Sequence, residues 1–383
     1  MRQVILSVFL FISFIIHIRG QIPIISHDSI VFVENTLKKV AGNVNFTVLP
    51  GPVSGTSNKV GFMVLPMIVY NLDKQDTLSP PSSSAILFYF DFHGSWVTAV
   101  KQSFYWNQNK WRAFISAGIG DMQLKFFGIG RDSVIINNDA SNYVWTHEAG
   151  FVASVNCFRK IYKGLYGGLE YRYNISNLEG KDSLSNESLI QSGFPVGKIS
   201  ESALIPAFIW DDRDNIYWST RGYYGSLSFQ FANGFLFSSD DYGVVSGWIN
   251  GYHSLLRDRK SLILAWHLFA QSGYGDLPFA RFANFGQGDD ATGYTRGKYM
   301  NNAEAAVQAE LRYELWKFIS CGGYLGTGKV FSSYAVFGQS AWLHFGGVRL
   351  YLNIIPSRNI RLRLDAALAR GDWGFYVGIG QGF

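Results

Sequence analysis

Short segments in which apolar and polar residues alternate recur along this sequence. From Glu304 to Leu315, the odd positions read Ala, Val, Ala, Leu, Tyr and Leu, and every even position except an alanine is Glu, Gln or Arg. The same alternation runs through Leu165–Asn174, Tyr223–Phe231 and Arg361–Leu368. Successive side chains of a β-strand point to opposite faces, so each segment is predicted to be a strand with one apolar and one polar face.

The charges on the polar face separate two classes of β-protein. The outer face of a soluble sandwich rarely carries Glu and Arg so uniformly along a whole chain. In a transmembrane barrel, the apolar face meets lipid and the polar face lines the lumen. Charged residues are as scarce as aromatic ones, at 16% each, whereas soluble domains average about 25% charged residues. The sequence therefore predicts an all-β fold, a transmembrane antiparallel β-barrel.

The first 20 residues have the character of a secretory signal. Arg2 precedes an apolar run from Val4 to Ile16, and a small residue, Gly20, lies at the expected cleavage point. The run is too short to span a bilayer as a helix. We expect export, cleavage near Gly20 and residence in the outer membrane of a Gram-negative-type bacterium, with outer-membrane lipid as a partner.

The spacing of turn signals sets the number of strands. At roughly 22 residues for each strand and its turn, the exported chain has about 16 strands, with 14 as the alternative because a first strand within residues 43–52 is weak. Longer loops are expected at about 127–142, 175–201 and 273–302. The expected organisation is a signal peptide (1–20), a short periplasmic segment (21–59) and the barrel (60–383).

Charge and cysteine content exclude several other functions. The net charge is +5, but Lys and Arg are scattered along the chain, so no nucleic-acid partner is expected. Cys157 and Cys321 are too few and too far apart for a metal motif or a disulfide framework, and their pairing stays open.

Three motifs that suggest chemistry are better explained by structure. Gly323–Lys329 resembles a P-loop but has Val330 where the metal-binding Ser or Thr belongs. Asp211, Asp212 and Asp214 suit a hard cation, but alternation divides them between two faces, so a stabilised turn is favoured. Ser340 lacks a nucleophile elbow, although His267 and His344 can still meet by folding. No enzyme activity, metal or other cofactor is expected.

The final strand carries a signature of outer-membrane assembly. Trp373, Phe375, Val377, Ile379 and Phe383 share one face, opposite a face rich in glycine. An aromatic residue at the end of such a strand, here Phe383, is the usual assembly signal. The outer-membrane assembly machinery is therefore an expected partner, and closure of the barrel is expected to leave no free edge in lipid.

Three landmarks give the chain from about residue 60 a resemblance to a known family. The first is the turn from Trp210 to Asn215 with Asp212, Arg213 and Asp214, followed by Gly222. The second is the run Leu277-Pro278-Phe279, then Thr292–Tyr299, then Ala309–Arg312, and the third is Arg363-Leu364-Asp365 with the aromatic end. Together they resemble the barrel domain of the bacterial surface antigen family, the superfamily of BamA and TamA.

The resemblance implies a long loop folded into the lumen, followed by five strands. Its residues here are Gly293, Tyr294, Arg296 and Gly297, and the lumen charges near it are Glu310, Arg312, Arg363 and Asp365. The family's loop arginine is replaced by Thr292, so Arg296 is expected to tie the loop to Glu310 or Asp365. These charges either line a solute path or fill a rigid polar interior.

The family's activity implies translocation or assembly of protein or lipid, or a gated pore. The alternative is a closed structural or partner-binding barrel without transport. The periplasmic domains that receive clients in the family have no counterpart in residues 21–59, so an unknown periplasmic partner is expected instead. The substrate, conduction through the lumen, lateral opening and the oligomeric state stay open.

Overall fold

In the part of the chain that the structure describes, sixteen strands form one antiparallel sheet. The computed structural model describes residues 44–54, 60–79, 82–129, 143–191, 196–215, 218–256, 262–286, 291–295, 297–355 and 359–383. The strands of the sheet are β1 (Val44–Ser54), β2 (Val60–Tyr70), β3 (Ser82–Asp91), β4 (Trp96–Trp106), β5 (Trp111–Phe126), β6 (Val144–Tyr162), β7 (Leu165–Gly180), β8 (Gly197–Asp211), β9 (Arg221–Ala232), β10 (Tyr242–Ser254), β11 (Leu262–Gly275), β14 (Ala303–Trp316), β15 (Ile319–Phe331), β16 (Leu343–Ile355), β17 (Ile360–Ala369) and β18 (Asp372–Ile379).

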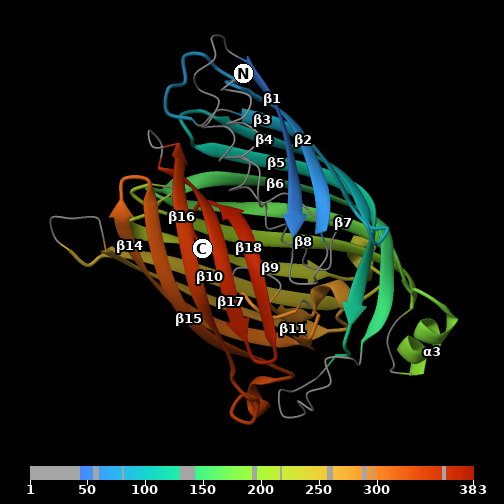
Figure 1. Cartoon of the computed structure of the whole chain (residues 1–383). Coiled ribbons are helices and arrows are strands. Elements are labelled where there is room, and N and C mark those ends of the chain that lie inside the picture. Colours follow the sequence, from blue (N-terminus) through green and yellow to red (C-terminus); the bar gives the residue numbers. More distant parts are fainter. Residues whose placement is uncertain are drawn as a thin grey trace.

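Each strand pairs with its neighbours in chain order, and the sheet curves round a central lumen (Figure 1). The one departure from direct succession is β11, which pairs with β14 because the short β12–β13 hairpin leaves the wall. Within the described residues, no ladder joins β1 to β18, the two strands at the ends of the sheet. The predicted all-β antiparallel wall of about 16 strands is confirmed, but the expected closure between its first and last strands is not seen in the described residues.

Alternation explains which residues face lipid. In β14, Val307 and Leu311 are 40% and 47% exposed, whereas Gln308, Glu310 and Arg312 between and beside them are buried. Because the buried side of the wall is the polar side, the charged face lines the lumen and the apolar face is turned outward, as the sequence predicted.

The two ends of the barrel differ in their links. One end carries short turns such as 107–110, 163–164 and 317–318, and we call it the turn side. The other carries the long links, such as 181–196, 276–302 and 332–342, and we call it the loop side. Short turns are periplasmic and long loops extracellular in barrels of this class. β1 begins and β18 ends at the turn side.

Two expectations about boundaries need correction. The sheet begins at Val44, so the predicted barrel start at residue 60 is too late and β1 lies within the segment assigned to the periplasm. Pro50 and Pro52 weaken the strand signal there, because proline is unusual inside strands. Residues 175–201 are not all loop: β7 continues to Gly180 and α3 (Ser183–Gln191) follows. The predicted signal peptide lies outside the described residues.

Helices contribute little to the described part of the chain. Besides α3 it contains three short 3-10 segments, η1 (Gly234–Leu236), η2 (Phe279–Arg281) and η3 (Tyr334–Val336). Within these ranges, no helix has the length and apolar character that crossing a membrane as a helix requires.

Candidate functional site

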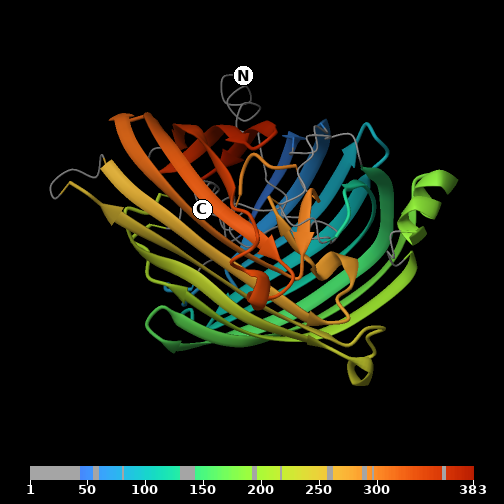
Figure 2. The same cartoon turned by 90° about the horizontal axis from the view of Figure 1, so that it is seen from below.

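A loop occupies the lumen. Residues 276–302, which we call the lumen loop, contain η2 and the hairpin of β12 (Ala283–Phe285) and β13 (Tyr299–Asn301). Figure 2 shows these orange elements inside the curved wall. Phe285 and Tyr294 of the loop are fully buried and lie against Phe345 of β16, with ring centroids 6.1 and 6.5 Å away. Aromatic packing therefore seats the loop on the inner wall.

Backbone geometry at the loop tip requires glycine. Gly293 has a φ of +110°, and a Cβ there would lie 3.1 Å from the Cβ of Ala369. A Cβ on Gly297 would lie 2.7 Å from the carbonyl oxygen of Lys125 in β5, on a distant part of the wall. Only residues without a side chain fit these close approaches. The loop thus contacts the wall both at β17 and at β5.

Hydrogen bonds fix the tip to the wall. They run from Gly293 N to Tyr376 OH (2.9 Å), from Thr292 Oγ1 to Tyr324 OH (3.0 Å), from Tyr294 OH to the carbonyl oxygen of His344 (2.8 Å) and from Lys298 Nζ to Asp372 (2.8 Å). Arg296, the predicted anchor, lies outside the described residues. Thr292, which replaces the family's arginine, takes part in anchoring through its hydroxyl group.

The base of the loop is held by a buried ion pair that the sequence analysis missed. Arg281 and Glu201 of β8 are 6% and 1% exposed, and Arg281 Nε lies 2.9 Å from each carboxylate oxygen of Glu201. The two residues are 80 positions apart. A lone charge among aromatic residues, at Phe279-Ala280-Arg281-Phe282, is the signal that would have pointed to Arg281.

The lumen charges singled out from the sequence form a network on β14, β16 and β17. Glu310 accepts hydrogen bonds from Arg312 Nε (3.0 Å) and Arg349 Nη1 (2.9 Å), and Asp365 lies 3.0 Å from Arg363 Nε. All of these side chains are buried. Arg349, which was not among the predicted residues, joins the two halves, because its Nε is 3.6 Å from Asp365. Its place on the lumen face of β16 was readable from alternation.

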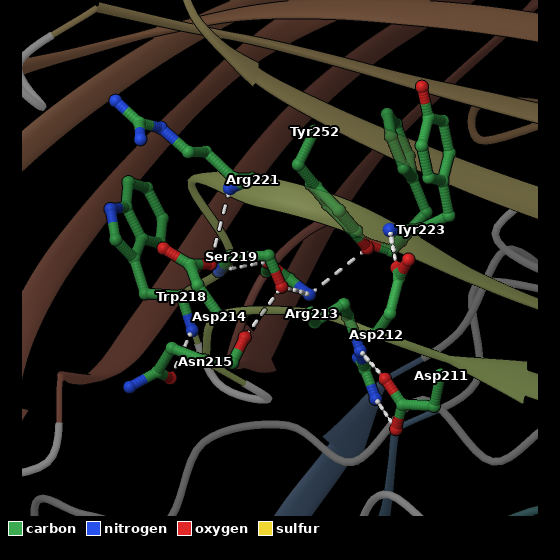
Figure 3. A network of polar contacts seen from close by, with 12 residues as sticks. Asp211, Asp212, Arg213, Asp214, Asn215, Trp218, Ser219, Arg221, Tyr223 and Tyr252 are labelled. Atoms are coloured by element: carbon green, nitrogen blue, oxygen red, sulfur yellow. Dashed lines mark hydrogen bonds and ion pairs between the residues drawn. The ribbon is translucent and has the colours of Figure 1, made fainter. Parts of the chain in front are cut away.

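The acidic turn between β8 and β9 is built by hydrogen bonds (Figure 3). Arg213 Nε and Nη2 donate to Asp211 (2.8 and 3.0 Å), and the backbone N–H of Tyr223 donates to Asp212 (2.5 Å). Gly222 has a φ of +101°, and a Cβ there would lie 2.6 Å from the carbonyl oxygen of Asp212. Each carboxylate serves a separate partner, an arrangement that favours a stabilised turn over a cation site.

Asp214 accepts several of the hydrogen bonds that stabilise this turn. It accepts from the backbone N–H of Thr220 (2.8 Å) and of Arg221 (3.2 Å), and from Thr220 Oγ1 (2.5 Å). We expect Asp214→Ala to lower the free energy of unfolding by about 1–3 kcal/mol, since these donors lose their acceptor. Urea unfolding in detergent micelles measures it. Asp214→Asn, which keeps one acceptor, should recover part of the loss, and equal loss in both variants would contradict this account.

The same turn contacts β17 and the residues after β18 at the turn side. Trp218 is buried and stacks on the guanidinium group of Arg361 at 3.8 Å. Ser219 N donates to Gln381 Oε1 and Gln381 Nε2 donates to Ser219 Oγ, both at 3.0 Å. These contacts join strands that are far apart round the wall, because β8 and β9 lie midway along the sheet and β17 and β18 at its end.

The prediction that Phe383 shares a face with Trp373 and Phe375 is wrong, because those two side chains are exposed and Phe383 is buried. β18 ends at Ile379, and at Gly380, with a φ of +88°, the chain turns into the lumen. Phe383 is only 8% exposed and packs against Tyr252, whose hydroxyl donates to the Phe383 carbonyl at 2.6 Å. Alternation places a residue on a face only while the strand continues, and here the strand stops first. A role for Phe383 in assembly stays a prediction.

The other motifs show no catalytic arrangement among the described residues. His267 bonds Asn250 (2.6 Å), His344 bonds Thr327 (3.0 Å), and Ser340 Oγ donates to a backbone carbonyl. Gly323–Lys329 lies within β15, whereas a P-loop lies between a strand and an α-helix; in the described part of the chain, only the three-residue 3-10 helix η3 comes after it. Cys157 and Cys321 are both free.

The sequence matches a known family, and the fold is similar to solved outer-membrane proteins. The profile of the Omp85 superfamily domain matches residues 87–367. The fold is similar to BamA from Haemophilus ducreyi lacking POTRA domains 1–3, with 12% identity, a TM-score of 0.59, and coverage of 89% of this chain and 71% of that one. It is also similar to CdiB from Acinetobacter baumannii (14% identity, TM-score 0.55, 88% and 60% covered) and from Escherichia coli (8%, 0.55, 89% and 62%). The chain thus spans about 60% of the CdiB chains. A search of curated proteins gives no significant match.

Proposed function

This chain belongs to the Omp85 superfamily of outer-membrane barrels, and from that premise we propose that it translocates or assembles protein or lipid through its wall. The observation that carries the proposal is that the lumen is obstructed while the boundary between β1 and β18, which we call the seam, is unpaired in the part of the chain that the structure describes. The anchored lumen loop lies inside the lumen, whereas β1 and β18 have no ladder between them in the described residues. An unjoined pair of strand edges offers backbone hydrogen bonds to a partner.

Hydrogen–deuterium exchange in micelles tests the seam. Backbone amides of β1 and β18 that face the seam are expected to exchange at least about tenfold faster than those in the ladder of β14 with β15, because amides without a partner are open to solvent exchange. The peptides from β14 and β15 in the same sample are the internal control. Equal protection of all four strands would mean a zipped wall and would favour the closed structural barrel.

The second candidate function is a gated pore, which the lumen loop disfavours in the resting state because it obstructs the lumen. In planar bilayers, we expect no steady current from the intact chain and an open current after deletion of residues 284–300, which removes the tip anchors at Gly293 and Tyr294. A variant deleted in the exposed link between α3 and β7 is the control for loop shortening. Steady current from the intact chain would support the pore instead, and silence in both would support a structural role.

The proposal extends to export and partners. Residues 1–20 are proposed to act as a signal peptide cleaved near Gly20, and residues 21–43 to lie on the periplasmic side. An unidentified periplasmic partner is proposed to deliver clients, and the assembly machinery to act on the last strand. We propose no enzyme activity. The family match supports the barrel and the membrane, and these partners rest on the resemblance alone.

A further inference from the structure

A groove of about 330 Å³ opens in the wall where β2, β3, β4 and β5 run side by side. It is lined on the lipid face by Ile68, Ile86, Val100 and Ile115, whose exposed fractions lie between 40% and 48%. These side chains share the outward parity of their strands. The groove is therefore continuous with the surface that the barrel presents to lipid.

A proline in β2 interrupts the strand pairing beside the groove. In the ladder of β2 with β3, Val64 pairs with Phe88 and Met67 pairs with Ala85 in the same register. The ladder is interrupted between these pairs, at residues 65 and 66 of β2. One of them is Pro66, which has no backbone N–H and so gives no bond to the carbonyl group of Ile86 opposite. A backbone acceptor without its ladder donor is unfavourable in hydrocarbon, so this place favours an occupant with some polar character.

A polar cluster caps the turn-side end of the groove. Gln102 Nε2 donates to Tyr70 OH (2.9 Å) and to the carbonyl oxygen of Ser83 (2.8 Å), and Ser84 Oγ donates to Gln102 Oε1. Tyr70 is the last residue of β2, so the cluster lies toward the turn-side end of the wall, and tyrosine is enriched where a membrane protein meets the membrane–water interface. The groove is thus apolar along its length and polar at one end.

We propose that this groove is a binding site for one phospholipid of the turn-side leaflet. The ester region lies against Gln102 and Tyr70 and near the carbonyl group of Ile86, and an acyl chain extends from there along the side chains of Ile86 and Val100. The occupant is a membrane lipid because the groove is open to the lipid face, is apolar along its length and is polar at one end. The site is independent of translocation and remains if the proposed function fails.

Native mass spectrometry of the refolded chain in a mild detergent tests the site, with 1-palmitoyl-2-oleoyl-phosphatidylethanolamine added in small molar excess. We expect one retained lipid per chain. Val100→Trp fills the groove and is expected to reduce retention at least about tenfold, equivalent to 1.4 kcal/mol. Val155→Trp is the matched control, because Val155 is 47% exposed on the lipid face of β6 and does not line the groove.

Two further variants keep the test decisive if Val100→Trp fails to fold. Gln102→Leu removes the polar cap without filling the groove, and Pro66→Ala restores the N–H that faces Ile86. Both are expected to weaken retention in chains whose folding is verified by heat-dependent gel mobility. Equal retention by the Val100 and Val155 variants, with no effect of the other two, would show ordinary boundary lipid and overturn the proposal.

Discussion

Glu310→Gln is expected to lower the free energy of unfolding of the barrel by about 3–5 kcal/mol, the usual cost of removing one partner from a buried ion pair. Glu310 is 1% exposed and accepts from Arg312 and Arg349, and from the hydroxyl of Tyr351 at 2.5 Å. Glutamine keeps the shape but removes the charge. The guanidinium groups of Arg312 and Arg349 would then face each other without the carboxylate between them. Their repulsion is strong because the protein interior screens charges poorly.

Urea unfolding in micelles, followed by tryptophan fluorescence, measures this loss. Glu314→Gln is the matched control on the same face of β14, because its side chain is 31% exposed and lies 3.7 Å from Arg361. A contact of this kind contributes about 0–1 kcal/mol. If the two variants lose the same stability, the network of Glu310 does not stabilise the barrel and the charges serve another purpose, such as lining a solute path.

Arg281→Ala is expected to release the base of the lumen loop and to cost about 3–5 kcal/mol, because the carboxylate of Glu201 stays buried without its partner. Arg281 Nε contacts both carboxylate oxygens of Glu201, and the carbonyl of Arg281 accepts from Gln271 Nε2 at 3.1 Å. The tip contacts remain in this variant. We therefore expect faster cleavage of the loop by proteinase K and flickering current in bilayers.

The double variant Arg281→Ala/Glu201→Ala separates the two causes of that loss. Removing both charges leaves no buried ion, so the double variant should be more stable than Arg281→Ala alone while its loop remains cleavable. If the loop of Arg281→Ala resists proteolysis as well as the parent loop does, the tip anchors alone hold it and the ion pair has no part in closing the lumen.

The strands and their faces were predictable because their signal is local. The alternation from Glu304 to Leu315 matches β14, and it correctly places Glu310 and Arg312 away from lipid. The signal was weak at β1, where Pro50 and Pro52 obscure the pattern; the strand expected within residues 43–52 does form, stabilised by its full ladder with β2. Tertiary pairing overrides local preference at such a place.

The contacts of the candidate site could not be predicted from local alternation. Arg281 and Glu201 were not singled out, because neither lies in a segment with clear alternation and their meeting depends on the path of the loop. The resemblance indicated a loop in the lumen and drew attention to Thr292–Tyr299, but the partners of its tip, Tyr324 and Tyr376, come from strands whose inner faces carry many aromatic candidates.

By itself, the sequence determined that this chain forms a wall of antiparallel strands with lipid on one face and charge on the other, since side-chain direction alternates residue by residue in any strand. The tertiary structure alone decided which residues meet inside. Ser219 and Gln381 are 162 positions apart and belong to distant parts of the wall, and Phe383 enters the lumen because the chain turns at Gly380. Contacts across a lumen depend on how the whole sheet curves, and no local pattern encodes that curvature.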